Sequence, residues 1–111
     1  WEKYKDNGLL VIAVPSNSFN QEKKDEKDVK DFCEVNFNIT FPITGIYNVK
    51  GEDAHDIYKW AKKNYGNKAI PKWNFHKILI NSEGKIIDTY SSLTNPESKK
   101  IISKIEELLN I

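Results

Sequence analysis

The chain contains no arginine and no methionine, one cysteine, and no run of 18 apolar residues. Because arginine is absent, all 17 basic residues are lysines, which carry a point charge and lack the planar pair of donors that recognises phosphate. The 17 basic side chains are balanced by 16 acidic ones, so no large field of one sign attracts an anionic partner. These absences argue against a nucleic-acid-binding protein and against a membrane-spanning one.

The single cysteine, Cys33, cannot form a disulfide within the chain. Small secreted domains usually depend on several disulfides, so this composition argues against that class and favours a cytoplasmic location. A length of 111 residues suits one domain, since domains commonly contain about 100–150 residues. We therefore expect a single globular domain over residues 1–111.

The start of the sequence is unusual for a complete protein. It begins at Trp1 within the helix-like segment Trp1–Lys5, and no methionine occurs anywhere. Proteolytic processing is an alternative explanation, but processing sites seldom fall inside a helix. We therefore expect the chain to be part of a longer protein.

Hydrophobic periodicity and turn residues predict an alternation of helices and strands. An unbroken apolar run suggests a strand covered on both faces, and two short β-branched runs joined by a loop ending in glycine suggest an antiparallel hairpin. The order of the elements predicts an α/β fold with a mixed sheet. The expected elements are a helix end at Asn7-Gly8, a strand at Leu9–Val14, a helix within Glu22–Phe37, a short extended segment through Ile46 and Val49, a helix from Ala54 to Tyr65 with Ile57 on its inner face, strands at His76–Ile80 and Lys85–Tyr90, and a last helix that Asn95 caps and Pro96 opens.

Several segments of the chain, taken together, resemble the glutathione peroxidase family. The resemblance rests on Val14–Glu22, on Asp31–Phe37 followed by Thr40–Pro42, and on Lys72–Phe75, in the family's order. It implies a thioredoxin-like α/β fold whose mixed sheet is flanked by helices, and a thiol peroxidase that reduces hydrogen peroxide or organic hydroperoxides in defence against oxidative stress. It further implies that the chain is a partial domain lacking the N-terminal strand or strands and most of the first helix.

Three residues match the family's polar groups around its reactive sulfur or selenium: Gln21, Trp73 and Asn74. Their side chains can all donate hydrogen bonds, which favour a thiolate and stabilise the oxygen that leaves the peroxide. The segment before Gln21 is one residue shorter than the family pattern, and Lys23-Lys24 replaces a usual Pro-Gly. The peroxidatic cysteine or selenocysteine itself is expected before Trp1, so we expect the 111-residue chain alone to be inactive.

Cys33 falls beside the apolar stripe of a predicted helix, where a cysteine is by default an inert small hydrophobe. The resemblance implies a second role, because family members without selenium often carry a resolving cysteine at this position. The two histidines, His55 and His76, have no metal-ligand spacing, so no metal site is expected. His76 follows the Trp73–Phe75 segment closely and is expected near the site, in a solvated or structural role.

The resemblance also implies the partners. The loop between Trp60 and Trp73 is short, as in the monomeric family members that prefer thioredoxin, so we expect a monomer when intact, no bound cofactor, and thioredoxin or glutathione as electron donor. The competing hypothesis is a non-catalytic thioredoxin-like binding module. In either case the missing strand would leave the edges of Leu9–Val14 and His76–Ile80 unpaired, so we expect the chain to be poorly stable alone.

Overall fold

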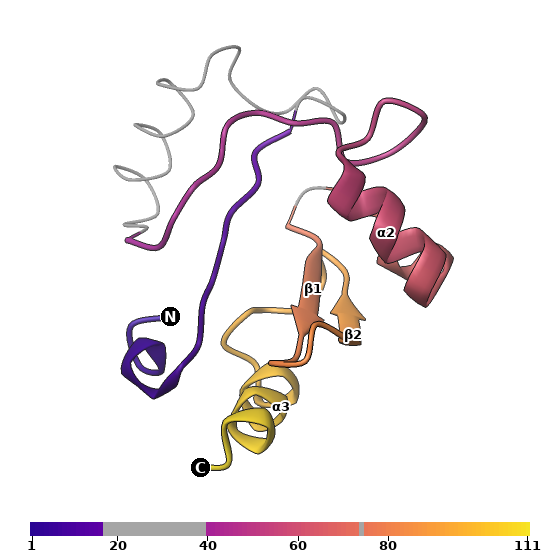
Figure 1. Cartoon of the computed structure of the whole chain (residues 1–111). Helices are drawn as coiled ribbons and strands as arrows, with labels where there is room; N and C mark the ends of the chain where they lie inside the picture. Colours follow the sequence, from indigo (N-terminus) through magenta and orange to yellow (C-terminus); the bar gives the residue numbers. More distant parts are fainter. Residues whose placement is uncertain (17–39, 74) are drawn as a thin grey trace.

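The computed structural model describes residues 1–16, 40–73 and 75–111, and Figure 1 shows how their elements are arranged. The helix predicted within Glu22–Phe37 lies outside these residues. The described part contains two short 3₁₀ helices, two α-helices and a two-stranded sheet. In chain order they are η1 (Lys5–Asn7), α2 (Asp56–Tyr65), η2 (Asn67–Ala69), β1 (Lys77–Ile80), β2 (Ile86–Tyr90) and α3 (Lys99–Leu109).

The predicted hairpin is confirmed, because β1 and β2 pair antiparallel, with Lys77 opposite Tyr90. The Asn81 side-chain oxygen accepts hydrogen bonds from the backbone N–H groups of Glu83 and Lys85, at 3.0 and 2.9 Å. An asparagine that closes a turn on its own backbone in this way competes with strand continuation. It therefore ends β1 sharply and sets the hairpin register.

The strand predicted at Leu9–Val14 is wrong as a continuous element. Within Leu9–Val14, Ala13 alone pairs with another described residue, through an isolated parallel bridge to Ile43. The Ala13 N–H donates to the Pro42 carbonyl and the Ala13 carbonyl accepts from Thr44, both at 2.9 Å. Pro42 has no N–H, so the ladder cannot continue through it. The parallel part of the expected mixed sheet is thus reduced to this bridge in the described residues.

The helix predicted from Ala54 is confirmed as α2, with one difference at its inner face. His55 caps its start, because its Nδ1 atom accepts a hydrogen bond from the Ile57 N–H at 3.1 Å. Gly66, with φ of 84°, ends it in a conformation that other residues rarely adopt. Ala61 is buried as expected, but Ile57 is 49% exposed, so its placement on the inner face was wrong.

The last helix is confirmed as α3, but its predicted cap is wrong. The helix begins at Lys99 after Ser98, three residues later than expected from Asn95. The Asn95 side-chain oxygen accepts from the Glu97 N–H at 2.8 Å, and its carbonyl accepts from the Ser98 N–H at 3.0 Å. Asn95 therefore forms a separate turn ahead of the helix, which is the common alternative use of this side chain.

The N-terminal segment packs on the C-terminal helix. Tyr4 is 5% exposed, and its hydroxyl donates to Glu106 of α3 at 3.0 Å. Gly8 ends η1 with φ of 110°, as the Asn7-Gly8 pair predicted, and a Cβ there would lie 3.6 Å from Leu109.

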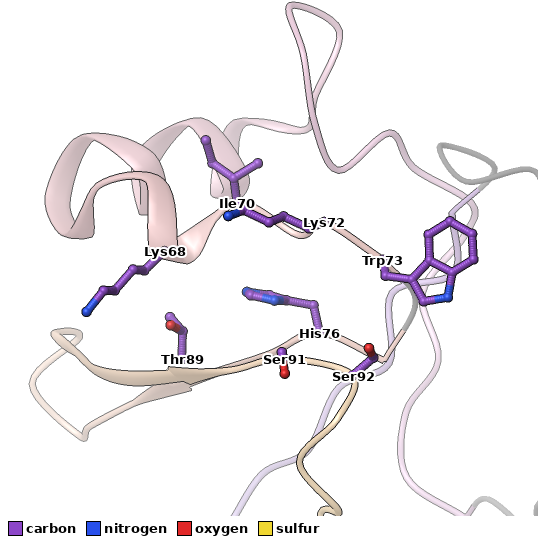
Figure 2. A pocket seen from close by; sticks show the side chains of 8 residues that line it. All are labelled: Lys68, Ile70, Lys72, Trp73, His76, Thr89, Ser91 and Ser92. Atoms are coloured by element: carbon purple, nitrogen blue, oxygen red, sulfur yellow. The ribbon is translucent and has the colours of Figure 1, made fainter.

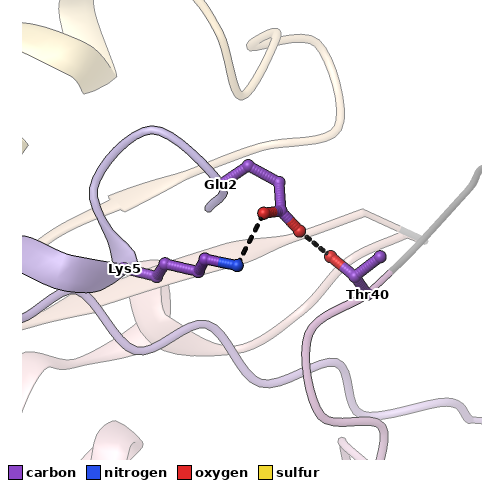
Figure 3. A network of polar contacts seen from close by, with 3 residues as sticks. All are labelled: Glu2, Lys5 and Thr40. Carbon is purple, nitrogen blue, oxygen red and sulfur yellow. Dashed lines mark hydrogen bonds and ion pairs between the residues drawn. The ribbon is translucent and has the colours of Figure 1, made fainter.

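A second contact ties the same segment to Thr40. The Glu2 carboxylate accepts from the Lys5 ammonium at 2.8 Å and from the Thr40 hydroxyl (Figure 3). Both donors lower the pKa of Glu2, the Lys5 ammonium more strongly. None of the helices in the described ranges is long and apolar enough to cross a membrane.

Candidate functional site

Trp73 lies at one end of an open hollow of about 240 Å³ between η2 and β2. Figure 2 shows the hollow, with side chains of η2 and the loop after it on one side and side chains of β2 and its exit on the other. The indole is 50% exposed, which is high for a residue type whose large apolar surface is usually buried. The lining residues are Lys68, Ile70, Lys72, Trp73, His76, Thr89, Ser91 and Ser92.

The wall that carries the two lysines is anchored by buried small residues. Ala69 of η2 is fully buried, and the backbone N–H of Ala69 donates to the Gly66 carbonyl at the end of α2. Pro71 is also buried and cannot continue a helix, so the chain leaves η2 in an extended conformation. Lys68 and Lys72 therefore project from the same wall of the hollow, and both side chains are exposed.

The turn after Trp73 is held by Lys77, the first residue of β1. The Lys77 ammonium donates to the Phe75 carbonyl at 2.7 Å and to the Ser91 carbonyl at 3.3 Å. Phe75 has φ of 63°, a left-handed conformation that is rare for an aromatic residue. Lys77 thus links the strained turn to the exit of β2, and nothing in the sequence pattern predicted this link.

The hollow is basic, and His76 lies within it. Figure 2 shows the imidazole projecting into the space between the two walls. Its Nε2 atom is buried and has no hydrogen-bond partner among the described residues. Burial, and then the nearby charge of Lys77, lower the pKa of His76 below its ordinary value of 6.5. None of the described residues that line the hollow is a carboxylate, and the charged side chains among them are Lys68 and Lys72.

Only one of the four predicted site residues lies in the described ranges. Trp73 lines the hollow, whereas Gln21, Cys33 and Asn74 lie outside the described residues, so their convergence on one atom stays a prediction. His76 lies near Trp73 as expected, and His55 is the cap of α2. In the described part of the chain, no group of three or more His, Cys, Asp or Glu residues is arranged to hold a metal ion.

The lysines of the hollow were not singled out from the sequence. Lys68 and Lys72 stand among 17 lysines, and nothing in their spacing separates them from solvated ones. The only signal is their position on either side of the Ile70-Pro71 pair, just before Trp73. The two lysines are recognised as lining a hollow only in the folded structure, where β2 and its exit form the opposite wall.

Known proteins resemble this chain in both sequence and structure. The sequence profile of glutathione peroxidase matches residues 1–62. The chain is 39% identical to "Glutathione peroxidase-like peroxiredoxin gpx1" of Schizosaccharomyces pombe over 87% of its own length, and it spans 63% of that relative. It is also 39% identical to "Glutathione peroxidase homolog BsaA" of Bacillus subtilis, covering 98% of this chain and 69% of that one.

The structural comparison gives the same result. The crystal structure of Trgpx in apo form superposes with a TM-score of 0.72 at 35% identity, covering 99% of this chain and 65% of that one. This establishes the expected thioredoxin-like α/β fold, whose antiparallel hairpin and flanking helices are the parts described above. The profile match and the identity over most of the chain lead to one conclusion: the chain belongs to the glutathione peroxidase family.

Proposed function

We propose that this chain is part of a thiol peroxidase that reduces hydrogen peroxide or organic hydroperoxides and thereby protects against oxidative stress. One structural observation carries the proposal beyond family membership. Trp73 keeps half of its surface exposed at the edge of a hollow, although burying an indole is among the largest apolar gains available to a fold. An exposed tryptophan on a braced turn suits a contact with a reacting group better than it suits packing.

The proposed reaction begins with a thiolate or selenolate from the residue expected before Trp1. This anion attacks one peroxide oxygen, a new bond to that oxygen forms, the O–O bond breaks, and an alkoxide or hydroxide leaves and takes a proton. Trp73 would donate its indole N–H, and Gln21 and Asn74 their amide N–H groups. Donors placed around the sulfur lower its pKa, and they also stabilise the negative charge that develops on the leaving oxygen.

In the proposal Cys33 completes the oxidative half of the cycle. Its thiol would condense with the sulfenic acid, so that a disulfide forms and water leaves. Thioredoxin would then reduce this disulfide by thiol–disulfide exchange, or glutathione would serve as donor, and no bound cofactor is required. We place this cycle in the cytoplasm, where both reductants keep thiols reduced.

The test uses protein that carries the peroxidatic residue, assayed with hydrogen peroxide and a thioredoxin system. Trp73→Phe should lower kcat/KM about 10- to 100-fold, since one transition-state donor is commonly worth a factor of this order or somewhat more. Trp60→Phe is the matched control and should leave kcat/KM within about twofold, because Trp60 belongs to α2 and does not line the hollow. Equal kcat/KM values in the two variants would overturn the role of Trp73.

The 111-residue chain provides a second check. It should show no peroxide reduction above a heat-inactivated control, because Cys33 is its only thiol and is assigned to the resolving step. Turnover comparable to an intact family member would show that the account of the nucleophile is wrong.

A further inference from the structure

Two hydrogen bonds of the Lys77 ammonium join the segment that carries Trp73 to the exit of β2. The ammonium donates to the Phe75 carbonyl at 2.7 Å and to the Ser91 carbonyl at 3.3 Å. Lys77 lies opposite Tyr90, which is 4% exposed, so the sheet fixes the start of the lysine side chain. Burial lowers the pKa of Lys77 below its usual value. The ammonium is thus partly withdrawn from water, where its hydrogen bonds to carbonyl groups are stronger.

The backbone of Phe75 explains why this segment needs to be held. Phe75 has φ of 63°, and a left-handed conformation is unfavourable for a residue with a bulky side chain. Its side chain is 69% exposed, so burial of the ring in a core does not account for the conformation. Such a conformation persists only where the surrounding structure maintains it. The bond from Lys77 maintains it by holding the Phe75 carbonyl.

A change in the backbone of Phe75 would move Trp73. The left-handed and right-handed values of φ differ by about 120°, and this rotation turns every preceding atom relative to β1. Trp73 comes two residues earlier, so its Cα lies within about 7.6 Å of the Phe75 Cα and would move by several ångströms. A misplacement of about 1 Å can lower a rate about 100-fold where a group must meet a reacting atom. The position of the Trp73 indole therefore depends on Phe75.

We propose that Lys77 is a positioning residue for peroxide reduction, because it keeps Phe75 in the conformation that holds the Trp73 indole at the reacting sulfur. The proposal rests on the peroxidase function proposed above and adds a residue that acts through Trp73. Lys77 affects one half of the cycle, since Trp73 serves the attack of the thiolate on the peroxide. The other half, in which the thiol reductant opens the disulfide formed by Cys33, does not use the indole.

The experiment compares Lys77→Met with Lys85→Met in protein that carries the peroxidatic residue. Lys85 is exposed near the other end of the hairpin and serves as the matched control. Kinetics with hydrogen peroxide and the reductant that supports the wild type give a separate kcat/KM for each substrate. Lys77→Met should lower kcat/KM for peroxide about 10- to 100-fold and leave that for the reductant within about twofold. Lys85→Met should leave both within about twofold. If both values fall by the same factor in Lys77→Met, the lysine only stabilises the fold and the proposal is wrong.

A second measurement needs no peroxide. The rate of alkylation by iodoacetamide across a pH series gives the pKa of a peroxidatic cysteine, because the thiolate is the form that reacts. Cys33→Ser in every protein removes the competing thiol of this chain. Trp73 helps to hold that pKa low, so Lys77→Met should raise it by about 0.5 or more, and Lys85→Met should not change it. An equal pKa in wild type and Lys77→Met overturns the proposal. If the wild type reduces no peroxide, the proposed function is wrong, and alkylation still decides whether Lys77 positions Trp73.

A double variant tests the route through Phe75. Asparagine adopts the left-handed conformation more readily than phenylalanine, so Phe75→Asn removes much of the strain that Lys77 opposes. Adding Phe75→Asn to Lys77→Met should therefore raise kcat/KM for peroxide at least about threefold over Lys77→Met alone. If Lys77→Met does not fold, Lys77→Gln takes its place, since its amide keeps one donor group. No gain from Phe75→Asn shows that Lys77 does not act through Phe75 and overturns the proposal.

Discussion

Replacing Lys77 by methionine tests whether this side chain braces the turn that carries Trp73. The substitution keeps the unbranched apolar stem and removes only the ammonium group, which donates to the carbonyls of Phe75 and Ser91 at 2.7 and 3.3 Å. We expect the turn at Phe75 to lose its link to the exit of β2. The left-handed conformation of Phe75 would then relax, because the Lys77 ammonium no longer holds the Phe75 carbonyl.

The size of the effect follows from the two distances. Hydrogen bonds to a charged group contribute about 1.5–3 kcal/mol when well formed and buried. The Ser91 bond is long for an N–H···O contact and both bonds are exposed, so the lower end of that range applies to the pair together. We therefore expect Lys77→Met to lower the free energy of unfolding by about 1–2 kcal/mol. For a domain of this size that corresponds to a decrease in Tm of roughly 4–16 °C.

Urea unfolding measures the stability change, and the indole N–H resonance of Trp73 reports the turn itself. Lys85→Met is the matched control, since Lys85 is exposed near the other end of the hairpin, and we expect a change within about 0.5 kcal/mol. The Trp73 resonance should shift in Lys77→Met and stay in place in Lys85→Met. Indistinguishable stabilities and an unmoved Trp73 resonance would refute the bracing role.

Three further predictions concern stability. Because the folded pKa of His76 lies below 6.5, the unfolded chain binds more protons than the folded one as the pH falls through that value. Tm should therefore decrease more between pH 7.5 and pH 5.5 in the wild type than in His76→Gln. Equal decreases in the two proteins would contradict this. Ile101 is 6% exposed, so Ile101→Ala should lower the free energy of unfolding, measured in urea, by about 2–4 kcal/mol. Leu93 is 94% exposed, so Leu93→Ala should lower it by less than about 0.5 kcal/mol. Similar losses in the two variants would contradict the assigned core. Tyr4→Phe removes the hydrogen bond to Glu106 and should cost about 1 kcal/mol by the same assay, and no loss would show that the bond contributes nothing net.

The parts of the fold that depend on neighbouring residues could be predicted from the sequence. The hairpin follows from two β-branched runs and a turn within Asn81–Gly84, and α3 follows from its apolar stripe. The cap of α3 was misplaced because Asn95 can use its side chain in a turn as well as in a cap, and the local sequence fits both. The strand at Leu9–Val14 was overestimated because a strand forms only where a second segment pairs with it. The apolar pattern of Leu9–Val14 does not reveal that Pro42 interrupts the segment that pairs with Ala13.

The candidate site shows the same limit. Trp73 was found through the motif that surrounds it, and His76 through its closeness in sequence to that motif. Lys68 and Lys72 could not be singled out, since their position at the hollow depends on a wall contributed by Thr89 and Ser91 some twenty residues later. The residues that define a motif are visible in one segment, whereas the residues that shape a hollow come from several.

The bond between Tyr4 and Glu106 has a consequence for synthesis on the ribosome. The two residues are 102 positions apart, so Tyr4 leaves the exit tunnel long before its partner exists. At a synthesis rate of about 5–20 residues per second, roughly 5–20 s pass between the synthesis of Tyr4 and that of Glu106. During that interval the N-terminal segment is accessible to chaperones and proteases, and the hydrogen bond to Glu106 can form only after α3 has been synthesised.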